Sequence, residues 1–234
     1  VAPDWFAQLG IRVLERPTPN TALVFNARFP GQQSGRAFER FTENGPLAVL
    51  PLPTISHADQ RYNVVWSVSN SAATTLGDLD DEAFRNHFQD AFGWRLGRVK
   101  AIGRRSQWPL VRLSASEQFR SGFLLVGNAA HTLHPVAGQG LNLSLREAGL
   151  LAQAIADAQQ HSAPIGCVQS LKTYLDQVSL EQRFVVDSTD ALATLFNRRG
   201  PLLDVPRDAS LALLDLLPAV RQQVASVGTG RRYA

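Results

Sequence analysis

The sequence predicts an α+β or α/β fold in which an antiparallel β-sheet comes first and long α-helices follow. The first third of the chain holds short segments rich in β-branched and aromatic residues, separated by turn signals, and the second half repeats apolar residues at helical spacing. Between them, an apolar segment at residues 123–126 leads through a glycine-rich loop into a helix. We therefore divide the chain into a β-rich unit (1–115), a strand–loop–helix segment (116–160) and C-terminal helices (161–234).

Four segments of the first third form the expected sheet. Residues 21–29 are rich in apolar and β-forming side chains. Residues 35–42 and 47–52 flank an Asn-Gly pair at positions 44–45, which is a strong signal for a turn between two strands. Residues 62–68 alternate polar and apolar side chains, as a half-buried strand does. Such a set is typical of an antiparallel sheet with one solvated face.

Helices are expected in the rest of the chain. Residues 78–92 begin with a run of acids, which suits the N-terminus of a helix, and continue with apolar side chains at helical spacing. Residues 98–110 are expected to form one more strand, ending near Pro109. Further helices are predicted over residues 141–159, 170–197 and 208–224.

The composition is that of a globular protein in a reducing compartment. The chain has 234 residues, of which 44% are hydrophobic and 18% charged, and this balance excludes a disordered protein. A formal net charge of +3 is too small for a nucleic-acid surface, so no nucleic-acid partner is expected. The single cysteine, Cys167, excludes an internal disulfide. Since no signal peptide or membrane-spanning run is visible, we expect a cytoplasmic protein whose membrane contact is peripheral.

The residues with chemical potential are concentrated at positions 127–142, which read GNAAHTLHPVAGQGLN. The apolar segment before them ends abruptly at Gly127. Gly138 and Gly140 allow a ligand or another backbone to approach closely, and Pro135 stiffens the loop. Asn128 can both donate and accept hydrogen bonds, which suits a ribose or ribityl hydroxyl.

The helix that follows this loop gives the segment its electrostatic character. A helix points the free N–H groups and the positive dipole end of its first turn back at the preceding loop. This arrangement suits a ligand with partial or full negative charge, such as the pyrimidine edge of a reduced flavin. The alternative is a plain strand-to-helix connection whose glycines serve only tight packing.

The histidines of the loop and several other residues have a structural interpretation. His131 and His134 fit structural hydrogen bonding; the alternatives are contact with a flavin phosphate and transfer of a proton. They predict no metal site because a third ligand is missing nearby. Trp66 is interpreted as core and Arg146 as a salt-bridge partner. Residues 104–105, both arginines, are interpreted as a solvated surface.

The whole string resembles the second flavin motif of the para-hydroxybenzoate hydroxylase superfamily, Gly-Asp-Ala-Ala-His followed by Pro, Gly and Gly-x-Asn. Asn128 in place of Asp, and the run at 132–140, are most similar to the ubiquinone-biosynthesis hydroxylases and among them to the 2-octaprenyl-6-methoxyphenol hydroxylase branch. Similar flanking runs are FERF at 38–41, GPLAVLPL at 45–52 and WPL at 108–110. The resemblance covers nearly the whole chain from about residue 10, and it leaves open which ring carbon is hydroxylated.

The resemblance implies an FAD-dependent monooxygenase that uses NAD(P)H and oxygen to hydroxylate a polyprenyl phenol in ubiquinone biosynthesis. It makes the β-rich unit the substrate-binding part. The implied flavin-binding residues are Gly127, Asn128, Pro135, Gly138, Gly140, Leu141 and Asn142. Pro135 would lie near the isoalloxazine ring, where the chemistry occurs, and Gly140, Leu141 and Asn142 would offer backbone N–H groups to the pyrimidine edge. Peripheral association with a biosynthetic assembly at the inner membrane is also implied, and a homo-oligomer is compatible with it.

Three departures from the family pattern bear on these expectations. Asn128 replaces an Asp, and Glu147 stands where an Asp is commoner, but both keep a hydrogen-bonding function. No Gly-x-Gly-x-x-Gly opens a βαβ unit, although this is the dinucleotide-binding fingerprint. The chain also begins at Val1 and holds no methionine. We therefore expect the C-terminal portion of such a flavoprotein, without the N-terminal Rossmann half, which alone binds flavin weakly or not at all.

Two alternatives to the hydroxylase remain at this point. One is a flavin-dependent reductase of the same superfamily. The other is a non-catalytic module that binds a lipid or a partner protein, which the missing dinucleotide fingerprint favours for this chain.

Overall fold

The computed structural model describes residues 5–31, 35–53, 59–132 and 139–197. These residues form two compact units. One unit is Arg16–Val111, and the other holds the described parts of Val1–Glu15 and Arg112–Ala234. Each unit is described by itself below. The three-part division drawn from the sequence stays a prediction, because it separates segments by role and not by packing.

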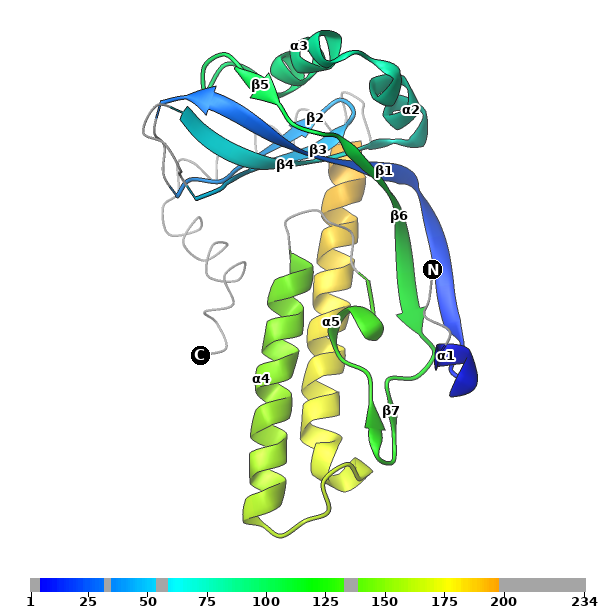
Figure 1. Ribbon diagram of the computed structural model, residues 1–234. Helices are drawn as coiled ribbons and strands as arrows, with labels where there is room; N and C mark the ends of the chain where they lie inside the picture. Colours follow the sequence, from blue (N-terminus) through cyan, green and yellow to red (C-terminus); the bar gives the residue numbers. More distant parts are fainter. Residues whose placement is uncertain (1–4, 32–34, 54–58, 133–138, 198–234) are drawn as a thin grey trace. The chain divides into compact units, whose positions relative to one another are not determined.

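A six-stranded sheet dominates the described structure, and its strands run in the order β2-β3-β4-β1-β5, with β6 also paired to β1 (Figure 1). Its strands are β1 Val13–Pro30, β2 Phe38–Thr42, β3 Gly45–Pro51, β4 Asp59–Ser69, β5 Ala101–Ile102 and β6 Ser106–Ala115. The central pair, β1 and β4, is antiparallel, with Leu23 opposite Trp66. The antiparallel sheet that the sequence predicted is therefore confirmed, and β1 begins eight residues earlier than the periodicity indicated.

In the unit Arg16–Val111, the core is a set of aromatic rings between the sheet and helix α3 Asp81–Phe92. Helix α3 lies on the same face of the sheet as α2 Asn70–Asp78 (Figure 1). Phe25 of β1 packs edge-on against Phe84 and Phe88 of α3, with ring centroids 5.0 and 5.1 Å apart. Trp66 is fully buried, as predicted. Edge-to-face ring pairs add stabilisation beyond the apolar area they bury, so these contacts fix the helix on the sheet.

The β2–β3 hairpin confirms the Asn-Gly turn. Thr42 pairs with Gly45 at the end of the two strands. Gly45 has a φ of +125°, and a Cβ atom there would collide with the carbonyl oxygen of Ser67. Glycine is therefore required at this position by both backbone conformation and close strand approach.

The single helix expected at residues 78–92 is wrong in its first turn. Two helices occupy this region, α2 Asn70–Asp78 and α3 Asp81–Phe92. The side chain of Asp80 accepts a hydrogen bond from the backbone N–H of Ala83, at 2.7 Å, and starts α3 as its N-cap. Helix α2 was not expected, because its sequence is rich in serine and threonine, which are weak helix formers in isolation.

Arg105 is not the solvated residue that the sequence predicted. Its guanidinium donates hydrogen bonds to the carbonyl oxygens of Leu76 and Leu79, which end α2, at 3.3 and 2.8 Å. It also pairs with Asp81 at 3.2 Å and lies over the ring of Phe84. Arg105 therefore caps one helix and ties it to the next. Its neighbour Arg104 is exposed, as expected.

The strand expected at residues 98–110 is divided into β5 and β6. At the break, the N–H of Gly103 donates to the carbonyl oxygen of Asn26 at 2.7 Å. Strand β6 then continues through Pro109 to Ala115. The sequence therefore located the extended chain but placed its break and its end wrongly.

The second unit is mainly helical. It contains α1 Trp5–Gln8, the short strand pair β7 Phe119–Arg120 and β8 Phe123–Leu124, the 3₁₀ turn η1 Gly127–Ala129, and the helices α4 Gln139–Gln160 and α5 Val168–Asn197. Helices α4 and α5 lie side by side as an antiparallel pair (Figure 1). Both were predicted to within two residues, whereas the expected helix at 208–224 lies outside the described residues. Within the described part of the chain, each helix is too short or too polar to cross a bilayer.

Gln89 offers a direct test of what holds α3 in place. This buried side chain donates to the carbonyl oxygens of Gly93 and Gly97 and accepts from the N–H of Val99 at 2.7 Å. Gln89→Leu leaves these three backbone groups without a partner, so we expect the free energy of unfolding to fall by about 3 kcal/mol. Urea denaturation measures it, with Asn86→Leu on the exposed face of α3 as the control. Equal stability of the two variants would contradict the role of Gln89.

Candidate functional site

The segment singled out by the sequence begins where β8 leads into the tight turn η1. Leu125 and Ala130, on either side of Gly127, are buried in a small apolar cluster with Phe6 and Ile11. The carbonyl oxygen of Gly127 accepts backbone hydrogen bonds from Ala130 at 2.9 Å and from His131 at 3.0 Å. The turn is thus fixed on both sides by packing and closed by its own backbone.

Gly127 is required by its backbone and by its neighbour on α4. Its φ is +61°, in the left-handed region. A Cβ atom at this position would lie 2.9 Å from Oγ of Ser144 and 3.1 Å from its Cβ. Ser144 is held there because its hydroxyl donates to the carbonyl oxygen of Gly140 at 2.9 Å. The glycine therefore lets the turn pack directly on the first turns of α4.

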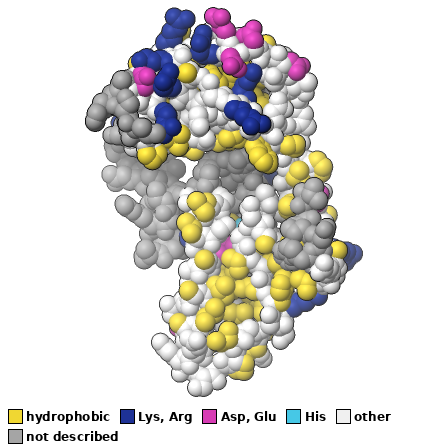
Figure 2. Space-filling model, viewed as in Figure 1, with side chains coloured by type: hydrophobic (Ala, Val, Ile, Leu, Met, Phe, Trp, Pro, Cys, Tyr) yellow, Lys and Arg dark blue, Asp and Glu magenta, His cyan; other side chains and the backbone are white. Residues whose placement is uncertain are grey.

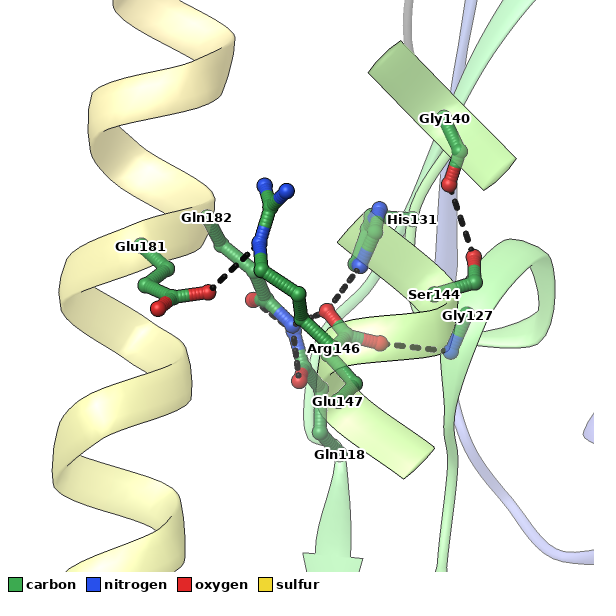
Figure 3. Close-up of polar contacts among 9 residues, drawn as sticks. All are labelled: Gln118, Gly127, His131, Gly140, Ser144, Arg146, Glu147, Glu181 and Gln182. Carbon is green, nitrogen blue, oxygen red and sulfur yellow. Dashed lines mark hydrogen bonds and ion pairs between the residues drawn. The ribbon is translucent and has the colours of Figure 1, made fainter. Parts of the chain in front are cut away.

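A fully buried carboxylate, Glu147 on α4, connects the turn to the rest of the unit (Figure 3). Its Oε2 accepts the backbone N–H of Gly127 at 2.8 Å. Its Oε1 accepts from Nε2 of His131 at 2.7 Å and from Nε2 of Gln182 on α5 at 2.9 Å. We call these four residues the Glu147 clasp. It joins the turn, α4 and α5 through one charged group.

A second layer of contacts supports the clasp from α5. Gln182 exchanges side-chain amide hydrogen bonds with Gln118, at 2.8 and 3.1 Å (Figure 3). Beside it, Nε of Arg146 lies 3.4 Å from Oε2 of Glu181. The expected salt-bridge role of Arg146 is therefore confirmed, and α4 and α5 are linked by polar contacts at two successive positions.

The clasp keeps Glu147 ionised despite its burial. Burial is the largest single influence and would raise the pKa of this carboxyl, but the hydrogen bonds from His131, Gln182 and Gly127 and the charge of His131 together lower it. Nearby, burial and then the negative charge of Glu147 raise the pKa of Tyr174 to about 12. The centre of the unit thus holds an anion that is matched by donors on several sides.

Of the predicted flavin-binding residues that the structure describes, one has its backbone N–H bonded inside the protein and others are exposed. The N–H of Gly127 is already bonded to Glu147, so it is not free for a ligand. Asn128 is exposed, and its side chain makes no hydrogen bond to the described residues. Leu141 is 70% exposed and Asn142 is also exposed in the first turn of α4, which starts beside Gly140. The N–H groups of a first turn have no acceptor within their own helix, so they face outward as donors.

Three residues named from the sequence lie outside the described residues, namely His134, Pro135 and Gly138. Their expected roles, including the position of Pro135 near the flavin ring, stay predictions. Within the described residues, no three histidine, cysteine or acidic side chains are grouped as a metal site requires.

Some polar groups of this segment have no hydrogen-bond partner among the described residues. Besides Asn128 and the first turn of α4, the ring of His131 has a second nitrogen, Nδ1, that is buried without a hydrogen-bond partner among the described residues. Because Nε2 of the same ring is bonded to Glu147, this nitrogen has a fixed direction. One half of His131 therefore has the expected structural role, and the other nitrogen is buried without a partner among the described residues.

The Glu147 clasp was missed by reasoning from the sequence, which treated Glu147 only as a departure from the family pattern. A usable signal was present. Glu147 stands four residues after Leu143, and both are fully buried on one face of α4. An acid at a position where helical spacing calls for an apolar residue indicates a buried carboxylate with partners.

Glu147→Ala tests the clasp. Its loss leaves the N–H of Gly127 and the side chains of His131 and Gln182 buried without their acceptor, so we expect the free energy of unfolding to fall by about 3–5 kcal/mol. The matched control is Asp157→Ala, an exposed acid on the same helix, for which a change within about 0.5 kcal/mol is expected. Chemical denaturation measures both, and similar losses in the two variants would contradict a special role of Glu147.

The lowered pKa of Glu147 gives a second prediction, on pH. A carboxyl whose pKa is lower in the folded state stabilises fully above its ordinary pKa of 4.5, and the contribution is lost as the pH falls through the folded pKa. Glu147→Gln removes this titration. The stability difference between the wild type and this variant should be constant between about pH 6 and 7 and should shrink below about pH 4.5. A difference independent of pH would contradict the prediction, because it would mean that the pKa of Glu147 is the same in the folded and the unfolded protein.

Comparisons with known proteins show the family of this chain. Residues 14–188 match the family model described as an FAD binding domain. The chain is 31% identical over 210 residues to the uncharacterized protein slr1300 of Synechocystis. This match covers 90% of this chain and 50% of that protein. It is 33% identical over 191 residues to the ubiquinone hydroxylase UbiL of Rhodospirillum rubrum, covering 82% of this chain and 43% of the relative.

A solved structure shares the fold. The p-nitrophenol 4-monooxygenase PnpA of Pseudomonas putida superposes with a TM-score of 0.67 at 16% identity, over 95% of this chain and 55% of that chain. The chain thus spans about half the length of the relatives that it matches. On the family match, which covers most of its residues, this chain belongs to the FAD-binding monooxygenase family, with a ubiquinone-biosynthesis hydroxylase among its homologues.

Proposed function

We propose that the protein containing this chain is an NAD(P)H-using, FAD-dependent monooxygenase that hydroxylates the ring of a polyprenyl phenol in ubiquinone biosynthesis. One observation carries the proposal. The N–H of Gly127 is bonded to Glu147, while Asn128 and the first turn of α4 at Leu141 are exposed, and the side chain of Asn128 has no hydrogen-bond partner among the described residues. This is a preformed set of donors at a helix N-terminus, as a partly anionic ring edge requires. The similarity to UbiL supports the substrate class.

Each free group has a defined task in this proposal. The backbone N–H groups of Gly140, Leu141 and Asn142 hold the pyrimidine edge of the flavin, and the side chain of Asn128 bonds to the ribityl chain. When bound, the flavin supplies the redox chemistry, taking reducing equivalents from the nicotinamide and using oxygen. The chain's own part is to orient the ring and to keep water away from it.

The Glu147 clasp fixes the groups that orient the flavin ring in this proposal. A ligand at the first turn of α4 experiences the helix dipole only if the helix end and the turn keep their relative positions. Glu147 fixes them through the N–H of Gly127 and the ring of His131. The donors are therefore ready before the ligand arrives, which lowers the ordering cost of binding.

A second function, binding of a lipid or protein partner without catalysis, is favoured by the surface of the helical unit. Apolar side chains gather on its visible face (Figure 2). On α4, Leu141 and Leu145 are 70% and 62% exposed, and on α5, Leu180 and Phe184 are 68% and 55% exposed. Exposed apolar groups of this kind are typical of surfaces that another molecule covers.

Activity of the full-length protein separates these functions. We expect bound flavin, NAD(P)H oxidation stimulated by a polyprenyl phenol, and incorporation of one oxygen atom from labelled O₂ into the phenol. NAD(P)H oxidation with reduction of a prenyl double bond and no oxygen incorporation would instead identify a reductase. Absence of flavin absorbance even after FAD is added would contradict both and favour the binding module.

Asn128→Leu tests the assignment at residue level. Since the amide would lose its hydrogen bonds to the ribityl chain, FAD affinity of the full-length protein should fall about tenfold, as measured by flavin fluorescence on titration. Asn86→Leu, on the exposed face of α3, serves as the control and should bind FAD normally. Unchanged affinity in Asn128→Leu would remove this residue from the site without affecting the activity test.

A further inference from the structure

The sheet unit has a solvent-open hollow of about 790 Å³ at the C-terminal end of α3. It lies where β2 begins and where the chain leaves α3. Its lining residues are Arg36, Ala37, Phe38, Glu39, Arg40, Phe92, Trp94 and Arg95. Lys and Arg side chains are prominent on the visible surface of this unit (Figure 2). A hollow of this size can hold a small organic ligand, since ligand pockets typically measure about 300–1,000 Å³.

Two of the three arginines in the hollow form no ion pair or hydrogen bond with the described residues. Arg40 has a structural task, because its Nη1 donates to the carbonyl oxygen of Phe92 at 2.5 Å and caps the negative end of α3. Gly93 makes room for this contact, since a Cβ atom there would lie 2.5 Å from the same nitrogen. Arg36 and Arg95 are exposed and form no ion pair or hydrogen bond with the described residues. Two guanidinium groups are therefore available to an anion.

Aromatic rings complete the surroundings. The guanidinium of Arg95 lies over the ring of Phe38, with 5.8 Å between its Cζ and the ring centroid. Trp94 lines the same hollow and is 66% exposed, so packing in the core does not explain its large ring. A guanidinium held on an aromatic face keeps its outward N–H groups for a ligand, and an exposed indole offers a surface for a planar ring.

We propose that this hollow binds a nucleoside diphosphate, with the phosphates on Arg36 and Arg95 and the base against Trp94. Arginine presents paired donors that match phosphate oxygens, and a phosphate-bearing ligand would balance the excess of positive charge over the single acid, Glu39. Inorganic phosphate alone would leave most of the hollow and the aromatic surface unused. The size, the charge and the rings thus point to one ligand class together.

Titration of the full chain with ADP tests the proposal. Isothermal titration calorimetry should show saturable binding of ADP, with weaker binding of inorganic phosphate and of adenosine, because each carries only half of the recognised groups. Arg36→Gln and Arg95→Gln should each weaken ADP binding about tenfold or more. Trp94→Ala should weaken binding of ADP and adenosine but leave that of inorganic phosphate unchanged. These results do not depend on whether the proposed hydroxylase activity is found.

The controls separate this site from general charge attraction. Arg98→Gln removes an exposed arginine that does not line the hollow, and it should bind ADP like the wild type. Arg95→Lys keeps the charge but loses the paired donors, so it should also weaken binding. Thermal melting confirms that each variant is folded.

Three outcomes would overturn the proposal. The first is absence of ADP binding at millimolar concentration. The second is an equal loss of affinity in Arg98→Gln and Arg95→Gln. The third is binding to phosphatidylglycerol vesicles, but not to ADP or to phosphatidylcholine vesicles, which would assign the arginines to a lipid headgroup.

Discussion

The helical unit depends on a single buried anion. Glu147 is fully buried, and a carboxylate removed from water without partners costs several kcal/mol. Here it accepts hydrogen bonds from a backbone N–H, an imidazole and a side-chain amide, which belong to Gly127, His131 and Gln182. These donors come from three places: the turn η1, the residues just after it, and α5. The free-energy cost of burying the charge is therefore offset only when all three segments are in place. The carboxylate therefore makes their arrangement cooperative.

This arrangement also decides which groups can meet a ligand. The N–H of Gly127 points into the unit and is used by Glu147, so the glycine has a structural role even though it stands at the start of the family motif. Asn128, one residue later, is exposed. On the other side of the loop, α4 presents an exposed first turn at Leu141. The buried N–H of Gly127 and the exposed side chain of Asn128 are thus one residue apart. The bond of Gly127 to Glu147 holds the turn that carries Asn128 in position.

The sequence predicted those parts of the structure that depend on local periodicity. Alternation located the sheet strands, and helical spacing located α4 and α5 to within two residues. Several of the failures depend on a contact between residues that are separated in the sequence. The cap of Arg105 on Leu76 and Leu79, the bonds of Gln89 to Val99, and the clasp all join groups that no local pattern relates. The roles of Asn128 and of the first turn of α4 stay predictions from the motif, whereas the role of Glu147 needed the packed helices.

An apolar residue at position 147 is the physical alternative to the clasp. Well-packed hydrophobic groups in place of a buried ionic network often give equal or greater stability. An apolar side chain would fill the space between the turn and α5. It could not accept a hydrogen bond from the N–H of Gly127 or from Nε2 of His131, so it would not fix the orientation of either group. With Glu147 present, Nε2 is engaged, and Nδ1 is left buried with no hydrogen-bond partner among the described residues. A buried nitrogen without a partner lowers stability, so the network is better explained by the orientation it imposes on the turn and on the start of α4 than by the stability it adds.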